Sequence, residues 1–153
     1  TVEITEDLLL DNIGQARSVF DMLRRNGIRV AIDDFGSGYS ALWYLREFPV
    51  DEIKLDKEFV APVLTHPASA AIVRSVIGLA HDLGITPVAE GVENAETAQQ
   101  LLEFGCEVGQ GFHYSRPLPA VELTGLLAAR TRHNAAGDYF AAGTRRSDIE
   151  LMQ

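Results

Sequence analysis

The sequence predicts an α/β fold built on a parallel sheet. Strand-like and helix-like stretches alternate along most of the 153 residues, which is the pattern of successive β/α units. Glycine or proline closes most of these stretches, so the predicted connections are short. Apolar residues make up 46% of the chain, which is enough for a substantial core in a single domain and excludes disorder of the whole chain.

Three strands and two helices are predicted in the first half of the chain. The strands cover residues 2–5, 28–32 and 52–56. The first helix ends at Gly27 and has apolar residues at helical spacing: Leu8, Leu9, Ile13, Ala16, Val19, Phe20 and Leu23. The second helix is short and stops before Pro49, because the residue ahead of a proline disfavours helical geometry.

The second half predicts two further strands and three helices. The strands cover residues 86–89 and 107–109, and the clearest helix covers 67–83, with Gly84 as its stop. Asn94 is expected to cap the next helix, and a last helix ends near Arg130. We therefore expect a domain over 1–130, followed by a mobile tail or linker over 131–153, where no apolar period is sustained.

Two arrangements of these units compete. Five β/α units suit a small open sheet with helices on both faces. They are too few for a closed barrel of eight units, which takes about 250 residues. Composition and periodicity alone therefore favour the open parallel sheet.

Charge and composition exclude several classes of protein. The net charge of −9 argues against a nonspecific binder of duplex DNA, which would present a basic face. No apolar run reaches the roughly 20 residues of a membrane span, and no signal peptide is apparent. A single cysteine, Cys106, excludes an internal disulfide, fits a cytoplasmic location and is expected in the core. The four histidines are scattered, and His81 is expected at the surface.

Polar side chains gather where the predicted strands end. In parallel α/β folds the loops that build a site converge at the carboxyl edge of the sheet. Carboxylates gathered there repel one another unless cations intervene, and an oxygen-rich, thiol-free cluster suits Mg²⁺ or Mn²⁺. The candidate residues are Glu3, Asp33, Asp34, Lys54, Asp56, Glu90, Glu93 and Gln110. Each of these residues, taken alone, also has a purely structural explanation: it could form a turn, cap a helix or, as Lys54 with Asp56, belong to a solvated ion pair.

A rival motif lies at 36–41, where Gly-Ser-Gly-Tyr-Ser-Ala matches the dinucleotide fingerprint G-x-G-x-x-G/A. It follows a strand and has Asp56 about twenty residues later, as an NAD-linked oxidoreductase would. Against this interpretation, Asp33 and Asp34 would stand directly before the phosphate loop and repel a pyrophosphate.

Taken together, the motifs closely resemble the EAL-domain family of bacterial phosphodiesterases, which hydrolyse cyclic di-GMP to linear pGpG. The resemblance covers about residues 1–127 and implies a TIM-type (β/α) barrel, of which this chain would hold the last five β/α units. It replaces the expectation of an open sheet. The motifs are Val-Glu-Ile-Thr-Glu at 2–6, Asp-Asp-Phe-Gly-Ser-Gly-Tyr-Ser at 33–40, Ile-Lys-Leu-Asp at 53–56, Ala-Glu-Gly-Val-Glu at 89–93, Gly-Gln-Gly-Phe at 109–112 and Ser-Arg-Pro-Leu at 115–118.

The resemblance also implies ligands for two metal ions, Mg²⁺ or Mn²⁺. Glu3 is similar to a ligand of the first ion, and Asp33 to the carboxylate that bridges both. Asp34 and Glu90 correspond to ligands of the second ion, and Glu90 is also a proposed general base. Two metal ions roughly 3.5–4 Å apart can activate a water and neutralise the phosphoryl group.

Other residues take supporting roles by the same resemblance. Lys54 corresponds to the lysine that orients the attacking water. Glu93 is similar to the residue that holds the loop after Asp34, and Gln110 to a residue on the substrate side. Asp56 is expected to support the site.

The chain also departs from the family pattern. The Glu-Ala-Leu signature and the asparagine of the next strand, both first-metal ligands, are absent and would lie upstream of Thr1, whose strand-like surroundings suggest a fragment. A catalytically inactive relative that binds cyclic di-GMP or a protein partner is therefore an alternative. Unpaired strand edges near 2–5 and 107–109 predict a homodimer or other self-association. A sensory or GGDEF-type domain, or a membrane anchor, is conceivable upstream.

Overall fold

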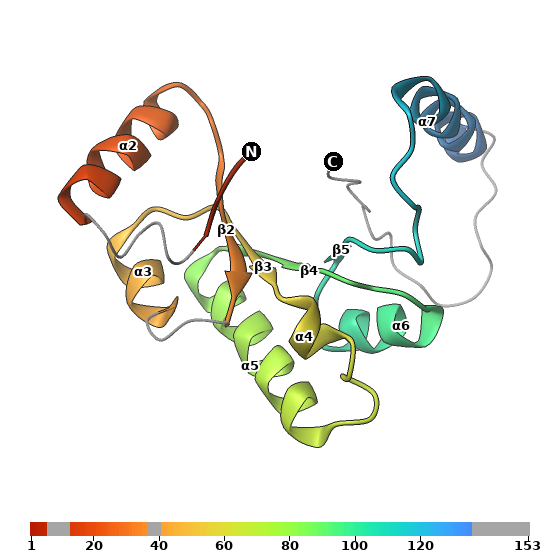
Figure 1. The fold of residues 1–153 in the computed structure, drawn as a ribbon, viewed down its shortest axis with the longest axis horizontal. Coiled ribbons are helices and arrows are strands. Elements are labelled where there is room, and N and C mark those ends of the chain that lie inside the picture. Colours follow the sequence, from red (N-terminus) through yellow and green to blue (C-terminus); the bar gives the residue numbers. More distant parts are fainter. Residues whose placement is uncertain (6–12, 37–40, 136–153) are drawn as a thin grey trace.

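The computed structural model describes residues 1–5, 13–36 and 41–135, and one parallel sheet forms its centre (Figure 1). The strands are ordered β1-β2-β3-β4-β5. They are β1 (Val2–Thr5), β2 (Val30–Phe35), β3 (Glu52–Leu55), β4 (Thr86–Ala89) and β5 (Val108–Gly109). The helices are α2 (Ile13–Arg25), α3 (Ala41–Glu47), α4 (Lys57–Val60), α5 (Pro67–Leu83), α6 (Ala95–Glu103) and α7 (Ala120–Ala135).

The strand order corrects the expectation of an open, doubly wound sheet. A doubly wound sheet reverses its direction of growth and places helices on both faces. Here each strand pairs with its neighbours in sequence, so every crossover advances the same way. Right-handed crossovers that all advance one way put their helices on one side of the sheet. This is the topology of part of a (β/α) barrel, as the resemblance implied.

One face of the sheet packs against the helices through two apolar clusters. Ile32 and Ile53 are partners in adjacent strands, are fully buried, and pack with Phe20 of α2 and other residues of the first cluster. The second cluster joins Leu55 and Ala89 of the sheet to residues of α4, α5 and α6: Val60, Val73, Ile77, Ala98 and Leu101. Because side chains alternate along a strand, the residues between these apolar ones lie on the other face.

The other face of the sheet carries charged side chains that are nevertheless buried. Glu3, Ala31 and Glu52 are aligned across β1, β2 and β3, and Lys54 lies two residues beyond Glu52 on the same face. Glu52 and Lys54 are only 2% and 4% exposed. Lys54 lies near the carboxyl ends of the strands and Glu52 at the amino ends, so the two charges mark opposite ends of this face.

Two predicted helices are confirmed with their caps. Helix α5 covers Pro67–Leu83 as expected, and Gly84 ends it with a φ of 71°. Asn94 caps α6, since its Oδ1 accepts a hydrogen bond of 2.8 Å from the backbone N–H of Thr97. Such side-chain oxygens satisfy amide groups that a first helical turn leaves unpaired.

Three local expectations need correction. The second strand runs to Phe35 rather than Ile32, so the aspartate pair lies inside it. The four-residue helix α4 was not predicted, because a single turn is too short to show an apolar period. The last helix continues to Ala135, beyond the predicted end near Arg130.

Some expectations concern residues outside the described ranges. Leu8 and Leu9 of the first predicted helix and residues 136–153 of the predicted tail belong to this group, as do positions 37–40 of the Gly-Ser-Gly-Tyr-Ser-Ala motif. Within the described residues, no helix combines the length and apolarity needed to cross a membrane.

Candidate metal and hydrolytic site

A bulge in β2 brings two consecutive carboxylates to one place. In a regular strand Asp33 and Asp34 would point to opposite faces of the sheet. The pairing of β2 with β3 shifts between Ile32 and Phe35, and Asp34 has a φ of 52°. A positive φ is uncommon for residues other than glycine, although aspartate tolerates it better than most. The bulge therefore re-aims the aspartate pair at the end of the strand.

Glu90 completes a cluster with this pair. It directly follows β4, and its backbone N–H donates to the carbonyl of Leu55 at 3.1 Å. Asp33, Asp34 and Glu90 each offer a carboxylate oxygen, and these three oxygens lie within 4.8 Å of one another. Hard divalent cations prefer such oxygen donors. The donor set therefore fits a hard divalent cation, the class to which the predicted Mg²⁺ and Mn²⁺ belong.

Lys54 lies among three of the predicted site carboxylates. Its Nζ atom is 2.7 Å from Glu90 Oε1, 2.9 Å from Glu3 Oε1 and 3.0 Å from Asp33 Oδ1. The lysine side chain is nearly buried, whereas the three carboxylates are 21–39% exposed. Lys54 therefore does not form a solvent-exposed ion pair with Asp56, which was one of the purely structural explanations for these residues.

The charges of the site shift two pKa values. Burial opposes the charged form of Lys54, but its hydrogen bonds to Glu90, Glu3 and Asp33 outweigh burial and raise its pKa well above the usual value. The pKa of Asp34 is also raised, first by its loss of hydration and then by the negative charges of Asp33 and Asp56. The ammonium group of Lys54 is therefore permanently charged near neutral pH.

The other predicted residues lie around this cluster with different contacts. Asp56 caps α4, because its Oδ1 accepts a hydrogen bond of 2.7 Å from the N–H of Glu58, and its charge also acts on Asp34. Glu93 and Gln110 are exposed, and neither side chain forms an ion pair or hydrogen bond with another described residue. The loop that Glu93 was expected to hold includes residues 37–40, outside the described ranges.

Two glycines allow the loops of the site to pack closely. A Cβ atom on Gly91 would lie 2.6 Å from Cβ of Lys57, and Gly91 has a φ of 66°. A Cβ atom on Gly111 would overlap the backbone of Val92. Both glycines lie in the motifs quoted above, but these constraints could not be predicted because a glycine's neighbours in space are not visible in the sequence.

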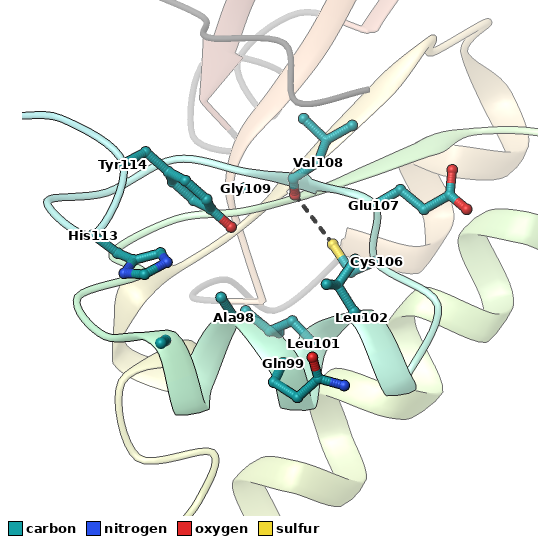
Figure 2. A pocket seen from close by; sticks show the side chains of 11 residues that line it. Ala98, Gln99, Leu101, Leu102, Cys106, Glu107, Val108, Gly109, His113 and Tyr114 are labelled. Atoms are coloured by element: carbon teal, nitrogen blue, oxygen red, sulfur yellow. Dashed lines mark hydrogen bonds between the residues drawn. The ribbon is translucent and has the colours of Figure 1, made fainter. Parts of the chain in front are cut away.

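A separate cavity of about 220 Å³ lies between α6 and β5 (Figure 2). Cys106 and Tyr114 face each other across it, and the thiol of Cys106 donates to the carbonyl of Val108 at 3.3 Å. Cys106 is buried, as predicted, and His81 is exposed, as predicted. The cavity includes none of the predicted site residues, so it is distinct from the carboxylate cluster.

Comparison with known proteins gives one consistent family. Residues 1–117 match the family described as EAL domain. The cyclic di-GMP phosphodiesterase RocR of Pseudomonas aeruginosa is 45% identical over 117 residues, which are 76% of this chain and 30% of RocR. Among the curated relatives compared, the chain spans a small part of each protein, 15% of one and 30% of RocR.

Solved structures show the same fold. The EAL domain of DcpA from Mycobacterium smegmatis superposes with a TM-score of 0.79 at 45% identity, over 83% of this chain and 57% of that one. BlrP1 of Klebsiella pneumoniae, in a complex with manganese and cyclic di-GMP, gives a TM-score of 0.72 at 45% identity, over 75% of this chain and 29% of BlrP1. The chain therefore covers little more than half of a single such domain.

Proposed function

This chain belongs to the EAL-domain family, and from that membership we propose that it contributes the carboxyl-terminal β/α units of a metal-dependent phosphodiesterase, one that hydrolyses cyclic di-GMP to pGpG. The observation that carries the proposal is the cluster of Asp33, Asp34 and Glu90 beside the buried Lys54. The names of the relatives support the substrate, since RocR is a cyclic di-GMP phosphodiesterase and BlrP1 was solved with that dinucleotide.

The carboxylates divide between two metal positions in this proposal. Asp34 and Glu90 would hold one ion, Glu3 would hold the other, and Asp33 would contact both. When bound, Mg²⁺ or Mn²⁺ supplies charge neutralisation for the phosphoryl group and acidifies a water. The manganese in the BlrP1 complex supports a divalent ion of this kind.

In this proposal Lys54 orients the attacking water, and Glu90 accepts the proton that the water loses. The ammonium group of Lys54 has three hydrogens, which face Glu3, Asp33 and Glu90 in this structure. When one of these contacts is released, that hydrogen can be donated to the oxygen of an attacking water and fix its direction. Glu90 Oε1 lies 2.7 Å from Nζ and can accept the proton that this water loses. Gln110, Glu93 and Asp56 support the substrate side and the loops.

The test is Mn²⁺-dependent hydrolysis of cyclic di-GMP by this chain fused to the amino-terminal part of the DcpA EAL domain, which this chain does not cover. We expect pGpG as the product. Asp33→Asn should lower turnover by at least about 100-fold, because it removes the charge that both ions share. Asp82→Asn is the matched control, since Asp82 is exposed on α5.

Two results would count against the proposal. Turnover of Asp33→Asn equal to that of the Asp82→Asn control would exclude the two-metal assignment. Tight binding of cyclic di-GMP by the fused chain without hydrolysis would instead support the alternative of a catalytically inactive domain that binds the dinucleotide.

A further inference from the structure

The four-residue helix α4 lies directly after β3 and contacts two segments that carry the carboxylate cluster (Figure 1). On one side, Cβ of Lys57 packs on Gly91, the residue after Glu90. On the other side, the ring of Phe59 packs on Gly36, which directly follows β2. A Cβ atom on Gly36 would lie 3.2 Å from Cε2 of this ring. Helix α4 therefore links the end of β2 to the loop after β4.

Helix α4 is itself held firmly, so Phe59 offers a fixed surface to its neighbours. Val60, the next residue, is fully buried in the second apolar cluster, and Phe59 packs against that cluster while remaining partly exposed. Asp56 caps the helix, and its carbonyl accepts a hydrogen bond of 3.0 Å from the N–H of Phe59. Helix α5 contacts the same turn. Because such packing leaves little free space, the ring limits where the backbone of Gly36 can lie.

The aspartate pair needs support, because its backbone conformation is an uncommon one. Asp34 has a φ of 52°, and the pairing of β2 with β3 shifts between Ile32 and Phe35. A residue other than glycine keeps a positive φ only where the surrounding structure fixes it. Phe35 is 2% exposed within the first apolar cluster, and Gly36 lies against Phe59. Both residues that follow Asp34 are therefore held by packing.

The carboxylate cluster depends on this conformation. Asp33 and Asp34 would point to opposite faces of a regular strand, whereas here their oxygens lie within 4.8 Å of each other and of an oxygen of Glu90. Relaxation of Asp34 towards a regular strand would remove one oxygen from the cluster. Residues that only orient metal ligands typically change metal affinity by about 10–100-fold when they are replaced.

We propose that Phe59 is a positioning residue for the divalent cation: its ring acts through Gly36 to hold Asp34 in the conformation that keeps both aspartates at the cluster. The proposal rests on the proposed function and adds a residue that acts through a backbone contact rather than as a ligand. It gives the single turn of α4 a role at the site, since a packing contact of that turn sets the geometry of the ligands.

The experiment is calorimetric titration of the 153-residue chain with Mn²⁺ alone, well below the melting temperature of each variant. Phe59→Ala should weaken Mn²⁺ binding by about tenfold, because the ring no longer limits the backbone of Gly36. Phe59→Leu lacks Cε2 and Cζ, which lie near Gly36, but retains apolar volume, so its loss should be smaller. Asp33→Asn should remove most of the binding, which assigns the ion to the cluster.

The matched control is Phe104→Ala. Phe104 is also partly buried and packs against the same second apolar cluster, but it follows α6 and precedes β5, away from the carboxyl ends of the strands. The variant should lower the melting temperature as Phe59→Ala does, yet keep Mn²⁺ affinity within about twofold of the parent chain. A merely structural role of Phe59 would give the same result for both phenylalanines.

The outcomes separate this inference from the proposed function. Equal Mn²⁺ affinities of Phe59→Ala and Phe104→Ala, with weak binding by Asp33→Asn, would overturn the positioning role alone. A parent chain that binds no Mn²⁺, or binds it equally well after Asp33→Asn, would overturn the metal assignment of the proposed function as well. If Phe59→Ala does not fold, Phe59→Leu takes its place in the same comparison.

Discussion

The ammonium group of Lys54 lies 2.7 Å from Glu90 Oε1, and this ion pair joins the carboxyl end of β3 to the residue that follows β4. The same nitrogen also contacts Glu3 and Asp33, so a single buried cation balances carboxylates that come from β1, β2 and the loop after β4. Without a positive charge at this point these carboxylates would repel one another. Lys54 therefore holds these carboxylates together, in addition to the role proposed for it in hydrolysis.

Replacing Lys54 separates these two roles. Lys54→Ala should lower hydrolysis by the fused chain more than it lowers Mn²⁺ affinity, because in the proposed function the side chain positions water. In EDTA the variant should lose about 1–3 kcal/mol of stability, since the carboxylates lose their counter-charge. Mn²⁺ should restore more stability to the variant than to the parent chain. Thermal unfolding with EDTA and with Mn²⁺ measures both effects.

The control for this experiment is Arg17→Ala, because Arg17 is an exposed cation on α2 and is not among the charges that act on Asp34 or Lys54. It should change neither the metal dependence of unfolding nor turnover by more than about twofold. Equal stabilisation of the Lys54→Ala variant and the parent chain by Mn²⁺ would contradict the organising role.

Periodicity predicted the individual helices and strands better than it predicted the arrangement of the sheet. Helix 67–83 and strand 86–89 were placed correctly because proline and glycine mark their ends. The doubly wound expectation was wrong because periodicity does not reveal the direction in which a crossover moves along the sheet. The barrel topology was instead predicted from the resemblance of the ordered motifs to the EAL-domain family.

Side-chain environments were the least predictable part of the site. The burial of Lys54 depends on three carboxylates that are far apart in sequence. The aspartate pair was expected after its strand, since two consecutive charges interrupt an apolar run, whereas a bulge keeps Asp33 and Asp34 within β2. Such contacts arise only once neighbouring strands are aligned.

At the amino end of the same face, Glu52 pairs with Arg29, and its Oε1 atom also accepts a hydrogen bond of 3.2 Å from the hydroxyl of Thr1. Arg29 Nη2 lies 3.1 Å from Glu52 Oε1, and the other carboxylate oxygen is buried with no hydrogen-bond partner among the described residues. Arg29→Met should lower the free energy of unfolding by about 1–2 kcal/mol. The ion pair contributes only a small part of this loss, because Arg29 is half exposed and solvent screens its charge. Adding Glu52→Gln should recover part of the loss, because it removes the buried charge. Urea unfolding of the single and the double variant measures these changes in the free energy of unfolding.

The surface pair of Arg46 and Glu47 provides the comparison for this prediction. Arg46 Nε lies 2.9 Å from Glu47 Oε1, but the arginine side chain is 72% exposed. Arg46→Met should therefore change stability by less than about 0.5 kcal/mol. A loss as small as this for Arg29→Met would mean that Glu52 is solvated from another direction.

The thiol of Cys106 should make stability depend on pH above 9. Burial raises its pKa from 9.0 to about 11, although backbone hydrogen bonding at Val108 and Ala89 acts in the opposite sense. The unfolded thiol ionises first, so the contribution of the protonated thiol is complete below pH 9 and is lost as pH rises towards 11. It amounts to roughly 2–3 kcal/mol. Urea unfolding from pH 8 to 11 should show a steeper decline than in Cys106→Ala.

Alkylation provides an independent measurement of the same burial. At pH 8 the native chain should react with iodoacetamide far more slowly than the urea-unfolded chain, because the thiolate is both rare and inaccessible. Rapid labelling of the native chain would show that the cavity beside Cys106 opens to solvent. Parallel pH profiles of the chain and Cys106→Ala would contradict the raised pKa.

The 153-residue chain should associate with itself, because its sheet ends in two strand edges within the described residues. Strand β1 pairs only with β2, and β5 pairs only with β4, which leaves backbone groups on their outer sides open to another strand. Light scattering on a sizing column should give a mass above that of one chain, rising with concentration. The chain fused to the amino-terminal part of the DcpA EAL domain should associate less, because the added strands would pair with both edges as in a closed barrel. It should also hydrolyse cyclic di-GMP faster, since the additional part would complete the set of metal ligands. A 153-residue chain that is monomeric at every concentration and turns over as fast as the fused chain would show that these edges are already protected, and that the described units suffice for function.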